Sequence, residues 1–436
     1  MHFTRKFFSF NLPRGLHISS GLIIVTTIIL SYLTSGHMVL TDTIGLRLEL
    51  QLILFVLIGF SIYLVRNNHL DNISLMLLFT IVCLIVGELI FRGDFYDVIG
   101  YLLTFSLCYI ALNMSKIRLL QSIDLLVAIN TLFAILAIAG FVIAANNVDI
   151  LFTMMERPEL YSKEPLNGKN IYRLFGNIDT NNTFLGMAIP RMNGPLQQAS
   201  LLPAYFILPL GIALAYSKVS LEKILIILFF ILLTLSGNTY VGLFSAGLVF
   251  IFRRFVPKVI YNYFPFIVLF LTTFLIFTFY FDELAVADAG KETLENIGGA
   301  GGAESNVIFA RIVSGLVRLA FIGKQFAGIL HSFFLPANED FVKLSLGSNL
   351  YTIGLIGGIF AMIPLSLIFF KLFTICSNGF NSLSTNKTQQ FGFCLVYAMI
   401  FQSMVYNDFG FSTYYGFLMI SIVLKLNFFD KQDAVK

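Results

Sequence analysis

The sequence contains little charge. Aspartate, glutamate, lysine and arginine make up only 12% of its 436 residues, whereas residues of the AVILMFWYC set make up 57%. Ordinary globular domains are about 25% charged and roughly 45–50% apolar. Because so few charged residues cannot cover a solvent-facing surface, the composition excludes a soluble protein and predicts an integral membrane protein.

The chain also lacks the features of nucleic-acid, metal and cofactor binding. Its 28 Lys+Arg are scattered against 24 Asp+Glu without a basic tract, which excludes nucleic acid as a partner. GxGxxG after a strand, GxxxxGK[ST], HExxH and GxSxG are all missing, so we expect no cofactor and no metal site. Four isolated cysteines without CxxC spacing predict neither disulfides nor a metal cage: Cys83, Cys108, Cys376 and Cys394.

Long apolar runs fill most of the chain instead. About 20 apolar residues at a rise of 1.5 Å cover the roughly 30 Å hydrocarbon core of a bilayer. We therefore predict one all-α polytopic membrane domain over residues 1–436 with about twelve transmembrane helices. These spans are expected near residues 17–34, 46–65, 73–91, 98–113, 124–146, 199–217, 222–236, 240–252, 262–281, 349–374, 391–406 and 411–427.

The span count depends on residues 222–252, one apolar run interrupted by Ser236-Gly237-Asn238-Thr239. Because Gly and Asn break helices, we expect a tight hairpin of two helices; a single kinked helix would leave eleven spans.

With twelve spans and a cytoplasmic N-terminus, short outer segments hold only Arg47 and Arg92. Short inner segments hold ten basic residues, namely Arg66, Lys116, Arg118, Lys218, Lys223, Arg253, Arg254, Lys258, Lys371 and Lys387. The positive-inside rule therefore favours twelve spans with both termini cytoplasmic.

Two long polar segments, residues 147–198 and 282–348, then fall on the outer face. Long loops in compact proteins are usually functional or disordered, and the aromatic and apolar residues in these two argue against disorder. We expect them to contain short amphipathic helices and to carry the chemistry of the protein.

Residues 307–325 have the pattern of one such amphipathic helix. Arg311, Arg318 and Gln325 are seven residues apart and therefore lie on one face, away from an apolar stripe. Two guanidinium groups in line suit a phosphate or pyrophosphate, because arginine is always charged and can donate two hydrogen bonds at once. The alternative is a basic interfacial helix that only holds lipid headgroups.

Other candidate residues follow in the same two segments. His331 is the only histidine in either segment and can exchange a proton near neutral pH, although a lone histidine is more often a satisfied structural residue. In the first segment Arg157 precedes Gly168 by ten intervening residues, Arg173 precedes Gly176-Asn177-Ile178-Asp179, and Arg191 leads into the sixth span. These arginines are placed to reach an anionic lipid headgroup. The alternatives are that they anchor the chain at the membrane interface, or that they pair with acidic residues on a solvated surface.

Several of these stretches follow one another as in a known family. They are Arg191-Met-Asn-Gly-Pro-Leu-Gln-Gln-Ala-Ser-Leu-Leu-Pro-Ala, Leu232-Leu-Thr-Leu-Ser236, and Arg311 with His331 ahead of Leu350-Tyr-Thr-Ile-Gly-Leu-Ile-Gly-Gly358. Together with about a dozen spans and two large outer loops, they resemble the Wzy-type O-antigen and capsule polymerases and the related O-antigen ligases. The Arg157 to Gly168 spacing matches the polymerases' Arg-x10-Gly pattern.

The sequence departs from the family at two points. Neither Arg311 nor Arg318 has a glycine at the Arg-x10-Gly spacing, since eleven and nine residues intervene before Gly323 and Gly328. The family's usual Ser-Arg is replaced by Ser236-Gly237-Asn238, which removes one arginine that in relatives is thought to face the site. Arg191 or Arg173 is the candidate substitute.

The resemblance implies glycosyl transfer on the periplasmic face of the bacterial inner membrane. A glycan on undecaprenyl pyrophosphate would be the donor and a second lipid-linked repeat unit the acceptor, with a chain-length regulator protein as a further partner. Arg311 and His331 would then be catalytic, and the substrate-binding residues would be Arg318, Arg191, Arg173, Arg157 and Gln325. The alternatives are an O-antigen ligase acting on lipid A core and a flippase; against a carrier, few ionisable residues fall inside the predicted spans.

Overall fold

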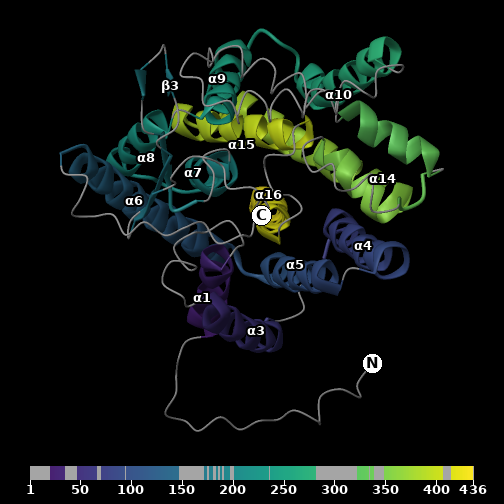
Figure 1. The fold of residues 1–436 in the computed structure, drawn as a ribbon, viewed down its shortest axis with the longest axis horizontal. Coiled ribbons are helices and arrows are strands. Elements are labelled where there is room, and N and C mark those ends of the chain that lie inside the picture. The colour runs from purple at the N-terminus through teal and green to yellow at the C-terminus, as the bar shows by residue number, and fades with distance from the viewer. Residues whose placement is uncertain are drawn as a thin grey trace, which may run out of the picture.

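The computed structural model describes the chain over residues 20–34, 47–65, 70–93, 95–146, 171–173, 176–179, 183–184, 187–188, 191–196, 201–234, 236–280, 322–332, 334–337, 348–405 and 414–435. Most of these residues are helical (Figure 1). The helices are α1 (Ser20–Leu33), α3 (Arg47–Leu64), α4 (Asn72–Gly87), α5 (Phe95–Asn113), α6 (Lys116–Asn146), α7 (Leu208–Tyr216), α8 (Leu221–Leu233), α9 (Gly237–Phe252), α10 (Lys258–Tyr280), α14 (Asn349–Asn381), α15 (Lys387–Val405) and α16 (Tyr414–Val435). Two π-helical segments, η1 (Glu88–Arg92) and η3 (Pro203–Ile207), adjoin α4 and α7.

Each of the twelve predicted apolar segments overlaps one of these α-helices, so the prediction of a helical chain is confirmed. Within the described residues, four helices are long and apolar enough to cross a membrane: Asn72–Phe91, Lys116–Gly140, Lys258–Ile276 and Asn349–Asn381. Six further apolar helices are shorter: Gly21–Leu33, Glu49–Leu64, Asp97–Asn113, Pro203–Tyr216, Thr239–Phe252 and Tyr415–Phe429. The fold is that expected of a polytopic membrane protein.

Large apolar side chains cover much of the outer surface of the bundle. Phe244 on α9 is 68% exposed and Phe270 on α10 is 66% exposed, with many leucine, isoleucine and valine side chains exposed around them. Exposed apolar surface of this extent would make a protein aggregate in water. It is compatible with a surface that contacts lipid chains.

Helix α15 is central to the second half of the chain. It packs against α7, α9 and α14. The Tyr216 ring at the end of α7 lies 5.2 Å from that of Phe393, and the Phe250 ring near the end of α9 lies 5.6 Å from that of Phe391. Both contacts are made near the beginning of α15. Helices α7 and α9 therefore run antiparallel to α15.

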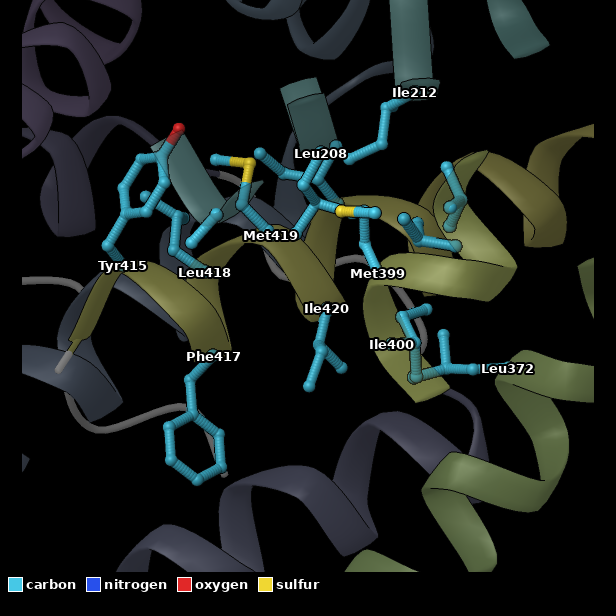
Figure 2. Close-up of a cluster of buried hydrophobic side chains, with 14 of the residues drawn as sticks. Leu208, Ile212, Leu372, Met399, Ile400, Tyr415, Phe417, Leu418, Met419 and Ile420 are labelled. Carbon is cyan, nitrogen blue, oxygen red and sulfur yellow. The ribbon is translucent and has the colours of Figure 1, made fainter. Parts of the chain in front are cut away.

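A buried apolar cluster joins α7 and α15 to α16 (Figure 2). Leu208 and Ile212 of α7, Met399 of α15 and Leu418 of α16 are all fully or nearly fully buried. Figure 2 shows Leu208, Ile212, Met399 and Leu418 within this one cluster. Lipid chains are as apolar as these side chains, so the cluster stabilises the contact between the helices through close packing rather than through removal of apolar surface from water.

Close packing of α7 on α15 depends on Gly392. A Cβ atom at this position would lie 2.5 Å from the backbone nitrogen of Ala215 and 2.8 Å from the carbonyl oxygen of Gly211. Both are backbone atoms, which cannot rotate away. Small residues at helix interfaces generally allow the backbones of membrane helices to come this close.

Gly392→Ala should therefore lower the thermal unfolding midpoint of the detergent-solubilised protein, with a loss of stability of about 1–3 kcal/mol typical of overpacking. Gly247→Ala on α9 is the matched control, because a Cβ there meets nothing within 4 Å. The control should be neutral or slightly stabilising, since alanine favours helix over glycine. Equal midpoints for the two variants would contradict this description of the interface.

The described part of the first long polar segment forms short strands. Strands β1 (Ile171–Arg173), β2 (Gly176–Asp179) and β5 (Arg191–Gly194) form an antiparallel sheet in the order β1-β2-β5, and β3 (Thr183–Phe184) pairs with β4 (Met187–Ala188). We expected short amphipathic helices in this segment, and for these residues that prediction is wrong. Glycine, asparagine and aspartate recur every few residues here and favour turns over helix.

The apolar run over residues 222–252 is divided into two helices, as predicted. Ser236 has extended backbone angles (φ −85°, ψ 110°) between α8 and α9. Helix α8 packs against α6, whereas α9 packs against α15. The turn therefore separates two helices with different neighbours.

Candidate functional site

The beginning of α14 and the end of α15 lie together. The Ser348 hydroxyl donates a hydrogen bond to the Met404 carbonyl oxygen at 2.6 Å, and the Asn349 side-chain amide donates to the Ser403 carbonyl oxygen at 2.6 Å. Both donors are buried. We refer to this end of the bundle, where α14 begins and α15 ends, as the loop end.

Helix α9 and segment η3 also begin at the loop end. A Cβ on Gly242, in the first half of α9, would lie 2.7 Å from Oε1 of Gln402 near the end of α15. Segment η3 precedes α7, which is antiparallel to α15, and η3 contacts both α9 and α15. The loop end thus collects the N-termini of three helical elements from distant parts of the sequence.

The first polar segment is attached at the loop end through strand β5. Gly194 has a positive φ of 64°, and a Cβ there would lie 2.5 Å from Cζ of Phe230. The Phe230 ring in turn lies 5.2 Å from the ring of Phe206 in η3. Only glycine combines this backbone angle with so close a ring contact. The strand that carries Arg191 therefore ends against the bundle.

The second polar segment is attached at the same end through Gln325. Residues 322–331 are helical, and Gln325 in this helix is 1% exposed. Its amide nitrogen donates to the Thr352 hydroxyl at 2.9 Å, and its amide oxygen accepts from the Ser348 backbone N–H at 2.8 Å. The helix is thereby fixed to the first turn of α14.

His331 lies at the end of this helix and is exposed. Three residues later Phe334 has a positive φ of 63°, which is rare for a bulky residue, and its carbonyl oxygen accepts a hydrogen bond from Ile359 N–H at 2.8 Å. The backbone on both sides of His331 is therefore attached to α14, by Gln325 before it and by Phe334 after it.

That second attachment uses a break in α14 that the sequence reasoning missed. Gly358 has φ 67° and ψ −166°, and the Ala337 N–H donates to the Leu355 carbonyl oxygen at 2.7 Å. A broken helix in an apolar bundle needs partners for its freed backbone groups, and residues 334–337 supply them. The Gly357-Gly358 pair was the available signal.

A buried polar cluster lies beneath η3 and was also missed. The Asn130 side-chain amide of α6 donates to the Tyr205 carbonyl oxygen at 2.7 Å and its oxygen accepts from the Tyr32 hydroxyl. The Tyr205 carbonyl cannot receive the usual α-helical hydrogen bond, because Pro209 has no N–H. The Tyr205 ring stacks on that of Tyr415, with centroids 4.6 Å apart. This cluster fixes the π-helical turn at the loop end.

Of the other predicted site residues, two lie in the strands and three lie outside the described residues. Arg173 is paired with Gly176 and Arg191 with Asp179, at opposite ends of β2, so the sheet does not bring these two positions side by side. Arg157, Arg311 and Arg318 lie outside the described residues. Gln325 binds other parts of the chain through both ends of its amide, and its role toward substrate stays a prediction.

The described residues include no group of three or more His, Cys, Asp or Glu side chains arranged to hold a metal ion. The groups that these residues bring to the loop end include the exposed His331 imidazole, the Lys324 ammonium group, helix N-termini and buried hydroxyl and amide groups.

Helical content, apolar helices long enough to span a bilayer and exposed apolar faces together describe a chain with the properties of a membrane protein. Comparison with protein-family models, with curated proteins and with solved structures finds no match to this chain.

Proposed function

We propose that the chain is a membrane glycosyltransferase that polymerises O-antigen or another surface polysaccharide. The observation that supports it is the attachment of two polar segments, more than a hundred residues apart in sequence, at one end of an apolar helical bundle. Gly194 against Phe230 attaches the first segment, and Gln325 against Ser348 attaches the second. Enzymes that act on lipid-linked substrates need polar groups assembled at one membrane surface, next to the lipid chains.

The reaction breaks the bond between the glycan anomeric carbon and the pyrophosphate oxygen of undecaprenyl pyrophosphate. A hydroxyl oxygen of the acceptor glycan forms the new bond to that carbon, and His331 takes the hydroxyl proton. Negative charge grows on the departing pyrophosphate. Arg311, Arg318 and Arg191 are the proposed cations that stabilise it, because fixed charges act most strongly where charge develops in the transition state.

The proposal includes twelve membrane spans with the loop end facing the periplasm and both termini in the cytoplasm. The opposite end of the bundle, where α9 ends and α10 and α15 begin, carries Arg253, Arg254, Lys258 and Lys387. Arg253 is buried there and donates to Oε1 of Gln390 at 2.9 Å. Basic residues collect on the cytoplasmic side of membrane proteins, which supports this orientation.

Deleting the gene from the source bacterium should leave lipopolysaccharide carrying a single repeat unit, because a separate ligase still transfers the unpolymerised unit. Electrophoresis of lipopolysaccharide measures this directly, and expression of the intact chain should restore the long ladder. Bare core with long glycan remaining on the lipid carrier would identify a ligase instead. For a capsular glycan, the length of carrier-linked chains is the equivalent measurement.

A further inference from the structure

Two buried hydroxyl groups at the first turn of α9 have no hydrogen-bond partner among the described residues. Ser236, at the N-cap position, is 1% exposed, and Thr239 is 0% exposed. Among the described residues, neither hydroxyl oxygen has a hydrogen-bond partner, and Ser236 does not cap its own helix. Buried polar groups are nearly always paired in folded proteins, so two unpaired hydroxyls in one turn indicate a ligand.

The position of these hydroxyls indicates which kind of ligand. The first backbone N–H groups of a helix have no partner within the helix, and the helix dipole places partial positive charge there. Helix α9 is 16 residues long, and its N-terminus lies at the loop end beside α15. Backbone N–H groups together with two hydroxyl donors form a site suited to a phosphate or other anion.

We propose that the N-terminus of α9, with Ser236 and Thr239, binds the pyrophosphate of the acceptor substrate. This assignment rests on the proposed polymerase function, in which both substrates carry a lipid pyrophosphate. The donor pyrophosphate leaves and gains negative charge, which calls for arginine. The acceptor pyrophosphate keeps its bonds and its charge throughout, so neutral donors and a helix dipole are sufficient to hold it.

Two pyrophosphate sites per chain distinguish a polymerase from a ligase. The lipid A core acceptor of a ligase takes the glycan without a lipid pyrophosphate on the acceptor side. A polymerase built as proposed should therefore bind two equivalents of a polyprenyl pyrophosphate, one through the arginines and one at α9.

The test measures binding of two probes to the purified full-length chain. Equilibrium dialysis with radiolabelled inorganic pyrophosphate tests the chemical class, and binding of polyprenyl pyrophosphate by the chain reconstituted in phosphatidylcholine vesicles tests the lipid-linked form. Ser236→Ala with Thr239→Val should weaken one of the two sites by roughly 10- to 100-fold and leave the other unchanged. Thr239→Ser keeps the hydroxyl and should retain binding.

The matched control is Ser421→Ala with Thr131→Val, which also removes two buried hydroxyls. These already have partners, since Ser421 donates to the Phe417 carbonyl oxygen at 2.9 Å and Thr131 to that of Val127 at 2.7 Å. The control variant should keep both sites. If it loses binding to the same extent as the test variant, general damage to the fold explains the loss and the site is rejected.

The remaining outcomes separate this site from the proposed function. Pyrophosphate binding that the double variant leaves unchanged, whether the wild-type chain has one site or two, overturns the α9 site even if the chain polymerises glycan. Two sites, one of them lost in the variant, in a chain without polymerase activity support the anion site and reject the polymerase. Binding of inorganic pyrophosphate without binding of the lipid-linked probe overturns the assignment to a lipid substrate.

In the active enzyme, the variant should raise KM for the acceptor and not for the donor.

Discussion

His331→Ala should lower turnover of the lipid-linked donor by roughly 10²–10⁴-fold, the range expected when a general base is removed. The imidazole is exposed at the last residue of a helix that Gln325 and Phe334 hold against α14. A base in a fixed position can meet the acceptor hydroxyl, whereas a freely moving loop would not hold it there. Glycan chain length and donor consumption in purified membranes, at matched protein levels, measure the effect.

Donor binding should change little in this variant, because the proposed role of His331 concerns proton transfer and not affinity. Leu330→Ala is the local control, since Leu330 is also exposed at the end of the same helix. It should polymerise glycan at close to the wild-type rate. Near-normal polymer from His331→Ala would reject the base and leave this histidine as a surface residue of the loop end.

Gln325→Leu should lower turnover by loosening the helix that carries His331. Leucine has a similar volume but leaves the Ser348 N–H and the Thr352 hydroxyl without the partners that Gln325 supplies. The Thr352 hydroxyl still donates to the Ser348 carbonyl oxygen at 3.0 Å, so the Ser348 N–H is the group left unpaired. An unpaired buried group of this kind costs about 1–3 kcal/mol, so the helix should detach more often and turnover should fall through His331. The sequence placed Gln325 on the same face as two arginines, and only the structure showed that its amide binds within the chain.

The sequence was sufficient to predict where the helices form. Each predicted span is a run of apolar residues long enough to approach bilayer thickness, and local composition alone decides that a helix is the outcome, because backbone groups in lipid must bond within their own segment. The turn at Ser236-Gly237 was predictable for a similar reason, since Gly and Asn locally favour a break. These properties depend on short windows of sequence.

The features that were missed depend on contacts between distant residues. The break at Gly358 has partners from residues 334–337, and the carbonyl of Tyr205 has its partner in Asn130, 75 positions earlier in the chain. Pairing of β2 with β5 joins residues that are separated by a hairpin. Helical periodicity describes one element at a time and contains no information on such pairs. The loop end therefore had to be seen in the assembled fold.

Arg311→Ala should remove about 2.7–4 kcal/mol of transition-state stabilisation, as expected for the loss of one donor at a site where negative charge develops. Arg311→Lys should also be impaired, although less, because lysine keeps the charge and loses the two parallel hydrogen bonds that a guanidinium gives to a phosphate. Donor turnover in vitro, with each variant at equal abundance in the membrane, orders the three proteins. Lys324→Ala, which removes a charge from the same polar segment, should stay within a few-fold of wild type. If Lys324→Ala and Arg311→Ala lose activity equally, general positive charge attracts the substrate and Arg311 has no specific role at the leaving pyrophosphate.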